Sequence, residues 1–315
     1  MVTGRAIVGL AVLFLNLFLY LRSAGGQEAP PFRAETRLVV LHATVKNSRG
    51  ELVTNLGQDA FTVYENGKRQ PIAVFRRDDI PVSLGLIIDN SGSMRPLRSK
   101  VEAAALALAR ASNPDDEIFV INFADKPRLD VPFTSDAGRL KAGIARVDSI
   151  GGTAMRDAVD AAEHYEIEHA TRDRKALLIV TDGNDNASLV SDDQIRQQAE
   201  QHEIVVYAVG LLHDQASSSG KRARHELDDL AMRTGGTAYY PTTIDGIDGV
   251  ALELARQIRN QYTIAYAPLN QALDGSYRRI RVTVTGPERF SVHTRTGYRA
   301  LPAQRGSRPS APPSS

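Results

Sequence analysis

Residues 82–94 read VSLGLIIDNSGSM, and this stretch decides how the rest of the chain is interpreted. Its first eight residues are almost continuously apolar, which is typical of a strand that is buried on both faces. The run ends at Asp89, and small polar residues follow it. A second apolar run, ALLIVTD at 176–182, ends in the same way at Asp182. The sequence therefore predicts two buried strands that each end in an aspartate.

Short apolar runs and helical stretches alternate around these two strands. Further strands are expected at EIFVINF (117–123), EIVVYAVG (203–210) and TAYYP (237–241), and helices are expected at 98–112, 154–170, 191–202, 225–236 and 248–262. The run RLDVPF (128–133) follows 117–123 after only a short turn, so we expect an antiparallel edge strand there. This alternation favours a doubly wound, Rossmann-like α/β domain with a mostly parallel central sheet.

The segments on either side of this region have a different pattern, because they contain strands and turns only. Asn66-Gly67 lies between two alternating runs, which predicts a β-hairpin. A sheet as small as either flank is marginal alone, so we expect the flanks to pair into one split, sandwich-like β-module around the inserted α/β domain. The expected organisation is a signal peptide or anchor at 1–26, half-modules at 27–80 and 263–300, an α/β domain at 81–262, and a disordered Pro/Ser-rich tail at 301–315.

Residues 1–26 have the pattern of a secretory signal peptide. Arg5 precedes an apolar run of 16 residues, Ala6–Leu21, and small residues follow at Ser23–Gly26. The run is shorter than the roughly 20 apolar residues that a bilayer-spanning helix needs. Arg22 follows the run directly, so an uncleaved N-terminal anchor is the alternative. We therefore expect a secreted or periplasmic protein, held at the inner membrane only if this segment is retained.

Charge and cysteine content exclude several classes of function. Lys and Arg number 38 and Asp and Glu number 37, so the formal charge is +1, and loss of Arg5 and Arg22 with a signal peptide changes it to −1. Neither value indicates a nucleic-acid partner. The chain has no cysteine, which excludes thiol enzymes, zinc fingers, iron–sulfur proteins and disulfide scaffolds. Any bound metal must have oxygen or imidazole ligands.

Polar residues from three loops are expected to meet at one edge of the α/β sheet, because the carboxyl ends of parallel strands lie together there. These residues are Asp89, Ser91, Ser93, Thr153 and Asp182. All five offer hard oxygen donors, which favour Mg²⁺, with Mn²⁺ or Ca²⁺ as alternatives. The sequence therefore predicts a divalent-cation site without a cysteine or histidine ligand.

Three motifs in this order resemble those of a known family. D-x-S-G-S at 89–93, G-G-T at 151–153 and T-D-G at 181–183 are similar to the metal-ion-dependent adhesion site of the von Willebrand factor type A domain. The resemblance covers about 81–262. The whole chain also resembles bacterial proteins related to this domain that are common in Acidobacteria, in GELVTNLGQDAFTVYENGKRQPIAVF at 50–75 and TRTGY at 294–298.

The resemblance implies a role for each of the five residues. Ser91, Ser93 and either Thr153 or Asp182 would bind the cation directly, and Asp89 would act through a water or through the ligands. A carboxylate from an Asp or Glu of a protein partner would complete the coordination. We therefore expect a non-enzymatic, extracytoplasmic, metal-dependent protein-binding module of the adhesion type.

Two other functions and two local interpretations stay open at this point. The chain could be a structural envelope-assembly protein with a vestigial metal site, or a metal-assisted hydrolase, although no histidine lies in the three loops to act as a base. Asp185 and Asn186 are expected as solvated loop or rim residues. The stretch ASSSGKRARH (216–225) is expected as a polar loop.

Overall fold

The computed structural model describes residues 37–77, 79–146, 151–183, 185–212, 216–243 and 246–302. The signal-peptide or anchor prediction for 1–26 lies outside these residues, as does the tail prediction beyond residue 302. A compact unit begins at Leu38. In the described ranges, no helix combines the length and apolar character that crossing a membrane requires.

A six-stranded sheet with the order β10-β9-β8-β5-β6-β7 forms the centre of the α/β region. Its strands are β5 (Val82–Asp89), β6 (Glu117–Phe123), β7 (Pro127–Thr134), β8 (Arg174–Thr181), β9 (Ile204–Gly210) and β10 (Ala238–Tyr239). All neighbours pair in parallel except β7, which is antiparallel to β6 at the sheet edge. The predicted mostly parallel sheet with one antiparallel edge strand is confirmed.

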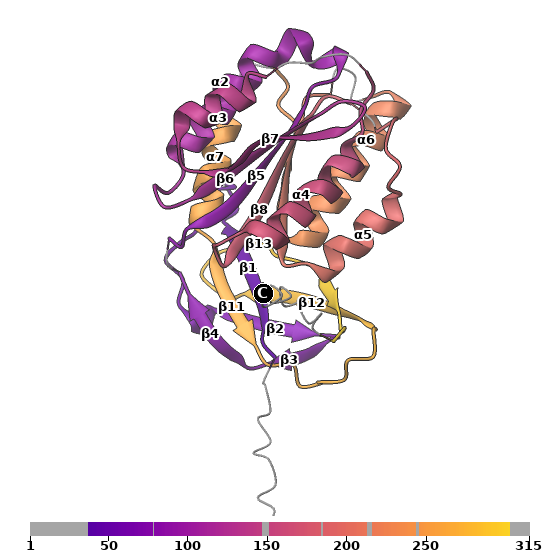
Figure 1. Ribbon diagram of the computed structural model, residues 1–315. Helices are drawn as coiled ribbons and strands as arrows, with labels where there is room; N and C mark the ends of the chain where they lie inside the picture. The colour runs from indigo at the N-terminus through magenta and orange to yellow at the C-terminus, as the bar shows by residue number, and fades with distance from the viewer. Residues whose placement is uncertain are drawn as a thin grey trace, which may run out of the picture. The chain divides into compact units, whose positions relative to one another are not determined.

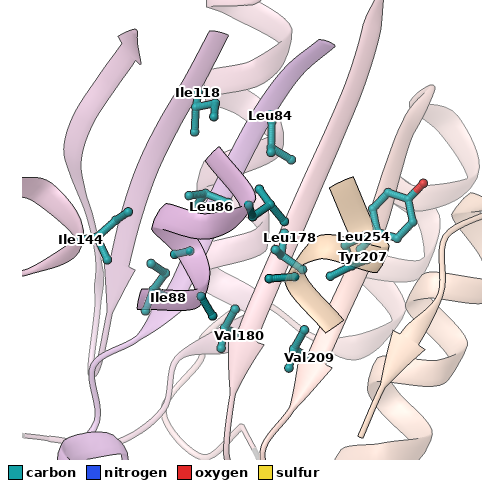
Figure 2. Packing of buried hydrophobic residues seen from close by; sticks show 14 of the residues in the cluster. Leu84, Leu86, Ile88, Ile118, Ile144, Leu178, Val180, Tyr207, Val209 and Leu254 are labelled. Atoms are coloured by element: carbon teal, nitrogen blue, oxygen red, sulfur yellow. The ribbon is translucent and has the colours of Figure 1, made fainter. Parts of the chain in front are cut away.

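Helices cover both faces of this sheet (Figure 1). One face carries α2 (Arg98–Ala111), α3 (Ala137–Ile144) and α7 (Ile247–Arg259), and the other carries α4 (Met155–His169), α5 (Asp192–Gln201) and α6 (Ser218–Thr234). Leu86 and Ile88 belong to the cluster under α2 and α7 (Figure 2). Ile87 belongs to the cluster under α4 on the other face. Because alternate side chains of β5 enter opposite cores, every residue of the strand is buried, which explains the continuous apolar run.

Two helices differ from the sequence expectation. The helix expected at 225–236 begins at Ser218, so the prediction of a polar loop at 216–225 was wrong. The Ser217 side chain accepts a hydrogen bond from Gly220 N at 3.0 Å, and Ala223 is buried, so a capped helix forms where the sequence suggested only polarity. The sequence analysis also missed α3, which Asp136 caps by accepting from Gly138 N at 2.6 Å and Arg139 N at 3.0 Å.

The flanking segments form two further four-stranded sheets with the orders β13-β1-β11-β4 and β14-β12-β2-β3. Their strands are β1 (Val39–Lys46), β2 (Phe61–Glu65), β3 (Lys68–Gln70), β4 (Ile72–Arg76), β11 (Tyr262–Tyr266), β12 (Tyr277–Val284), β13 (Ser291–His293) and β14 (Gly297–Arg299). The predicted hairpin is present, because Asn66 and Gly67 both have positive φ and join β2 to β3. We keep the nested division into an α/β domain inside a split β-module as a proposal.

Strands from before and after the α/β region share one apolar core. β1 and β4 pair with β11, and β2 pairs with β12, so each sheet combines both flanks. Leu41, Val63, Ile264 and Val282 belong to the cluster that fills the space between the two sheets. Neither flank buries its apolar face without the other.

A charged contact joins this β core to the α/β region. Glu200 at the end of α5 accepts from Arg233 of α6 at 3.1 Å and from Arg299 of β14 at 2.8 Å. Buried Arg295 also donates to the Glu200 carbonyl at 3.1 Å. Because Glu200 is only 9% exposed, its carboxylate depends on Arg233 and Arg299 to offset the cost of burial.

Glu166 of α4 supplies a test of the core electrostatics. It is fully buried, and burial raises the pKa of its carboxyl well above the usual value, although Lys175 opposes the shift. The folded-state pKa of Glu166 lies above its unfolded-state pKa, so the folded protein loses stability as pH rises and the buried carboxyl group ionises.

We expect Glu166→Gln to increase the free energy of unfolding at about pH 8, by about 1 kcal/mol or more, because glutamine cannot ionise, with little change at about pH 4. Chemical denaturation at both pH values measures this, with exposed Glu168→Gln as the control; an equal effect at both would contradict it.

Candidate metal centre

Four of the five predicted site residues form one hydrogen-bonded cluster. Asp89 ends β5, and its Oδ1 accepts from the backbone N–H of Ser91 at 2.8 Å. The hydroxyls of Ser91 and Ser93 lie 3.1 Å apart, and the Ser93 hydroxyl donates to Asp182 Oδ1 at 3.0 Å. The loops after β5 and β8, which are about 90 residues apart in sequence, therefore meet side chain to side chain.

Asp89 lies at the closed base of this cluster. Its Oδ2 accepts from the Thr181 hydroxyl at 2.6 Å, and neither residue is exposed to solvent. Burial raises the pKa of the Asp89 carboxyl, the bonds from Thr181 and Ser91 oppose this, and the nearby charge of Asp182 adds to it. Two buried neighbouring carboxyl groups are costly without a compensating positive charge. The base of the cluster is therefore an environment that favours a cation.

The cluster opens toward solvent at Ser93. Ser91 is 2% exposed and Asp182 is 7% exposed, whereas Ser93 and its neighbour Gly92 are exposed. The hydroxyl and carboxylate oxygens thus line a site with a buried floor and one accessible side. This arrangement leaves room for a ligand from outside the chain.

Thr153 is held beside the cluster by its backbone. Its N–H donates to Asn186 Oδ1 at 2.8 Å, and its carbonyl accepts from Asn186 N at 3.0 Å. The next residue, Ala154, donates to the Ala124 carbonyl at 2.7 Å, and Asn90 donates to the adjacent Phe123 carbonyl at 2.6 Å. The end of β6 therefore binds both the loop of Thr153 and the loop of Ser91.

The preceding glycines of the G-G-T motif are required by a close neighbour. Gly151 has a φ of 127°, which side-chain-bearing residues rarely adopt, and the Asp125 carboxylate occupies the space that a Cβ would need. Gly152 N donates to Asp125 Oδ1 at 2.5 Å. Asp125 thus fixes the approach of this loop to the site, a role that the sequence analysis missed.

The structure also corrects the interpretation of the loop after β8. Asp185 is not a solvated residue, because its side chain is 1% exposed and pairs with Arg156 at 3.1 Å. Asn186 is exposed, as expected, but its side chain also accepts a hydrogen bond from Thr153 N. Residues 182–186 read DGNDN. Asp and Asn side chains often form hydrogen bonds to loop backbone, so this composition was the signal in the sequence for the roles of Asp185 and Asn186.

A buried arginine that the sequence did not single out fixes the loop after β5. Arg98 of α2 is 7% exposed and donates to the side-chain oxygen of Asn90 and to the carbonyl of Arg146 at 2.9 Å. Asn90 Nδ2 donates to the same carbonyl at 3.0 Å. Asn90 is thereby held from two directions, which restricts the neighbouring Asp89 and Ser91.

The donor set fits a hard divalent cation. Two carboxylates and three hydroxyls offer oxygen ligands only, and Mg²⁺ prefers such ligands with waters in the remaining positions. Within the described ranges, no group of three or more His, Asp or Glu side chains is placed to hold a metal. A site with few carboxylates leaves a bound cation with positive charge that an outside carboxylate can neutralise.

Comparison with known proteins places this region in a family. Residues 84–184 match the family model described as von Willebrand factor type A domain. No curated protein matches the chain significantly.

Solved structures resemble parts of the chain at low sequence identity. The von Willebrand factor type A protein from Catenulispora acidiphila is 14% identical, covers 86% of this chain and 75% of its own, and has a TM-score of 0.47. The corresponding domain of the pilus tip protein Mfa5 from Porphyromonas gingivalis is 13% identical over 57% of this chain and 97% of its own, with a TM-score of 0.45. Proximal thread matrix protein 1 from the mussel byssus, with a zinc-occupied adhesion motif, is 18% identical over 62% of this chain and 50% of its own, with a TM-score of 0.47.

The bond from Thr181 to Asp89 is tested by Thr181→Val, which keeps the side-chain shape and removes the hydroxyl. We expect a loss of about 1–3 kcal/mol in the free energy of unfolding, because a buried carboxylate oxygen loses its donor. Urea denaturation of both proteins measures the difference. Thr283→Val, at a half-buried position of β12, is the matched control and should change little. A loss no larger than that of the control would contradict the role of this bond.

Proposed function

We propose that this chain, whose residues 84–184 match the von Willebrand factor type A model, is an extracytoplasmic, metal-dependent protein-binding module of the adhesion type. Ser91, Ser93, Thr153 and Asp182 would hold a divalent cation, with Mg²⁺ the best match to their oxygen donors. Asp89 would stay at the base and orient the ligands. The extracytoplasmic location is supported by the leader-like sequence of residues 1–26.

The observation that carries the proposal is the bonded set Asp89, Ser91, Ser93 and Asp182, with a buried floor and one exposed side. A purely structural turn would not need two carboxyl groups so close together at the end of the central strands. A cation offsets their mutual repulsion and presents positive charge at the exposed side. The site then binds a negatively charged group from a partner.

The partner group is an Asp or Glu carboxylate. A carboxylate is the common hard oxygen ligand that a protein surface offers, and its charge complements a cation held by few carboxylates. The chain itself carries almost no net charge, so long-range attraction contributes little to recognition. Binding therefore depends on the local cation and on the surface around it.

We infer that the site binds and does not catalyse. Metal-assisted hydrolysis requires a general base beside the open coordination position. The loops at 89–93, 151–153 and 181–190 contain no histidine. Asp89 and Asp182 belong to the cluster, and Asp185 is paired with Arg156. A binding role uses all of these residues without adding a group.

Metal-gated capture tests the proposed function. The chain is immobilised and exposed to solubilised native envelope, with Mg²⁺ or with EDTA, and the retained proteins are compared. We expect a partner that is retained with Mg²⁺ and lost with EDTA, because the cation supplies the contact. Ser93→Ala should lose the same partner, since it removes a hydroxyl ligand at the exposed side.

The controls separate the site from general effects. Ser291→Ala, at an exposed serine of the β-module, should capture the partner as the unmodified chain does. Amidation of envelope carboxyl groups with a carbodiimide should abolish capture. Two results would contradict the proposal. One is retention of the same proteins in EDTA, and the other is their retention by a Ser93→Ala variant whose circular dichroism shows an intact fold.

A further inference from the structure

The sheet β14-β12-β2-β3 has one face in the β core and one face away from it. Val63 of β2 and Val282 of β12 are paired in the register and belong to the apolar cluster of the β core. Because side chains alternate between the two faces of a sheet, the neighbours Tyr64 and Arg281 lie on the opposite face. Tyr64 is half-buried there and Arg281 is exposed.

A row of three side chains crosses this opposite face. The register pairs Tyr64 with Arg281 on one side and with Arg69 of β3 on the other, and directly opposed residues share a face. The Arg281 guanidinium lies over the Tyr64 ring, 4.6 Å from its centroid. Arg279 precedes Arg281 by two positions on β12 and is also exposed. We call the surface formed by Tyr64, Arg69, Arg279 and Arg281 the outer face.

The outer face carries positive charge that is open to a ligand. Within the described ranges, no ion pair joins Arg69, Arg279 or Arg281 to an acidic side chain. The acid next to Tyr64, Glu65, is buried on the core side and accepts from two tyrosine hydroxyls. An arginine stacked on an aromatic ring keeps the N–H groups at its edge for a carboxylate. The stacked pair of Arg281 and Tyr64 is therefore a pre-formed site for an oxyanion.

A hollow of about 420 Å³ adjoins the row at Arg69. Gln58, Asp59 and Thr62 line it with polar side chains, and Phe61 adds an aromatic one. Gln58 and Asp59 are exposed, and in the described part of the chain neither side chain forms a hydrogen bond. Their donors and acceptors are thus available to a ligand that carries several hydroxyls around an apolar ring, as a sugar does.

We propose that the outer face and the adjoining hollow bind an acidic polysaccharide. A neutral sugar fills the hollow and forms hydrogen bonds through its hydroxyls with Gln58, Asp59 and Thr62. Carboxylates of the neighbouring acidic sugars bond to Arg69 and Arg281. These two arginines lie two strands apart, about 10 Å across the sheet, which is close to the charge spacing in a polymer of alternating acidic and neutral sugars.

The charges around the hollow favour this ligand over other polyanions. A nucleic acid or an acidic peptide would meet a like charge at Asp59, whereas a sugar hydroxyl can donate to that carboxylate. Two copies of the outer face would bring arginines together, which disfavours self-association through it. The outer face contains no residue of the candidate metal centre, so the two sites can be tested separately.

Polysaccharide binding tests the proposal. Fluorescently labelled hyaluronan, alginate and polygalacturonate are each titrated with the chain, and fluorescence anisotropy reports binding. We expect at least one of them to bind, and added salt to weaken the binding. Reduction of its carboxyl groups to alcohols should weaken binding by about tenfold or more, because the arginines lose their charged partners. EDTA and Ser93→Ala should leave this binding unchanged, which separates it from the metal-dependent function.

Variants locate the contact. Arg281→Ala should weaken binding by about tenfold, since a stacked guanidinium is lost. Tyr64→Val should weaken it by about threefold, because Arg281 loses the ring that holds it. The matched control is Arg222→Ala on α6, which is exposed in the α/β region and should bind as the unmodified chain does.

Asp59→Ala separates sugar recognition from simple attraction between opposite charges. We expect about threefold weaker binding, because the hollow loses an acceptor for sugar hydroxyls, even though the variant removes a negative charge. Asp115→Ala, which removes an exposed carboxylate in the α/β region, is the control and should change little.

Several results would overturn the proposal. These are no binding of any of the three polysaccharides, equal binding of the native and carboxyl-reduced forms, or losses in the outer-face variants no larger than in the controls. Single-stranded DNA or polyglutamate that binds more tightly than the polysaccharides, and more tightly still to Asp59→Ala, would assign the outer face to that polyanion instead.

Discussion

The buried carboxylate of Asp89 is the group on which the candidate site depends. It ends the central strand β5, and its two oxygens accept from Thr181 of the neighbouring strand and from the backbone of Ser91. These two bonds fix the start of the loop after β5 against the end of β8. Beyond this join, the Ser93 hydroxyl bonds to Asp182 and lies next to the Ser91 hydroxyl. A charge in this position is costly, and a bound cation is the simplest physical reason for keeping it.

The sheet order explains why three loops converge at this carboxylate. β5 lies between β6 and β8, so its carboxyl end is flanked by both of their loops. The carbonyls of Phe123 and Ala124 at the end of β6 bind Asn90 and Ala154, which draws in the loop of Thr153. Helices cover both faces of the sheet, so this edge is where side chains of the central strands reach solvent. The strands of the flanking sheets approach the opposite end of the central sheet, where Arg174 at the start of β8 donates to the Gln261 carbonyl before β11.

Local patterns in the sequence predicted most of the scaffold and the five candidate ligands. The apolar runs predicted the strands correctly because a strand such as β5 is buried on both faces. The short turn before Arg128 predicted the antiparallel edge strand. The start of α6 was not predicted because its first residues, from Ser218 to Arg222, are small or polar. The whole of α3 was not predicted because it is only eight residues long and contains two glycines. Asp125, Asn186 and Arg98 were missed for a different reason. Their roles come from contacts with residues 27 to 48 positions away, which no local pattern contains.

We propose that the cluster of Asp89, Ser91, Ser93 and Asp182 holds a divalent cation. Crystals of the chain grown with Mn²⁺ test it most directly, because anomalous scattering locates the metal without reference to any partner. We expect an anomalous peak bounded by the Ser91 and Ser93 hydroxyls and the loop of Asp182. Crystals that contain Mn²⁺ only elsewhere, or that leave this cluster empty at saturating metal, would contradict it.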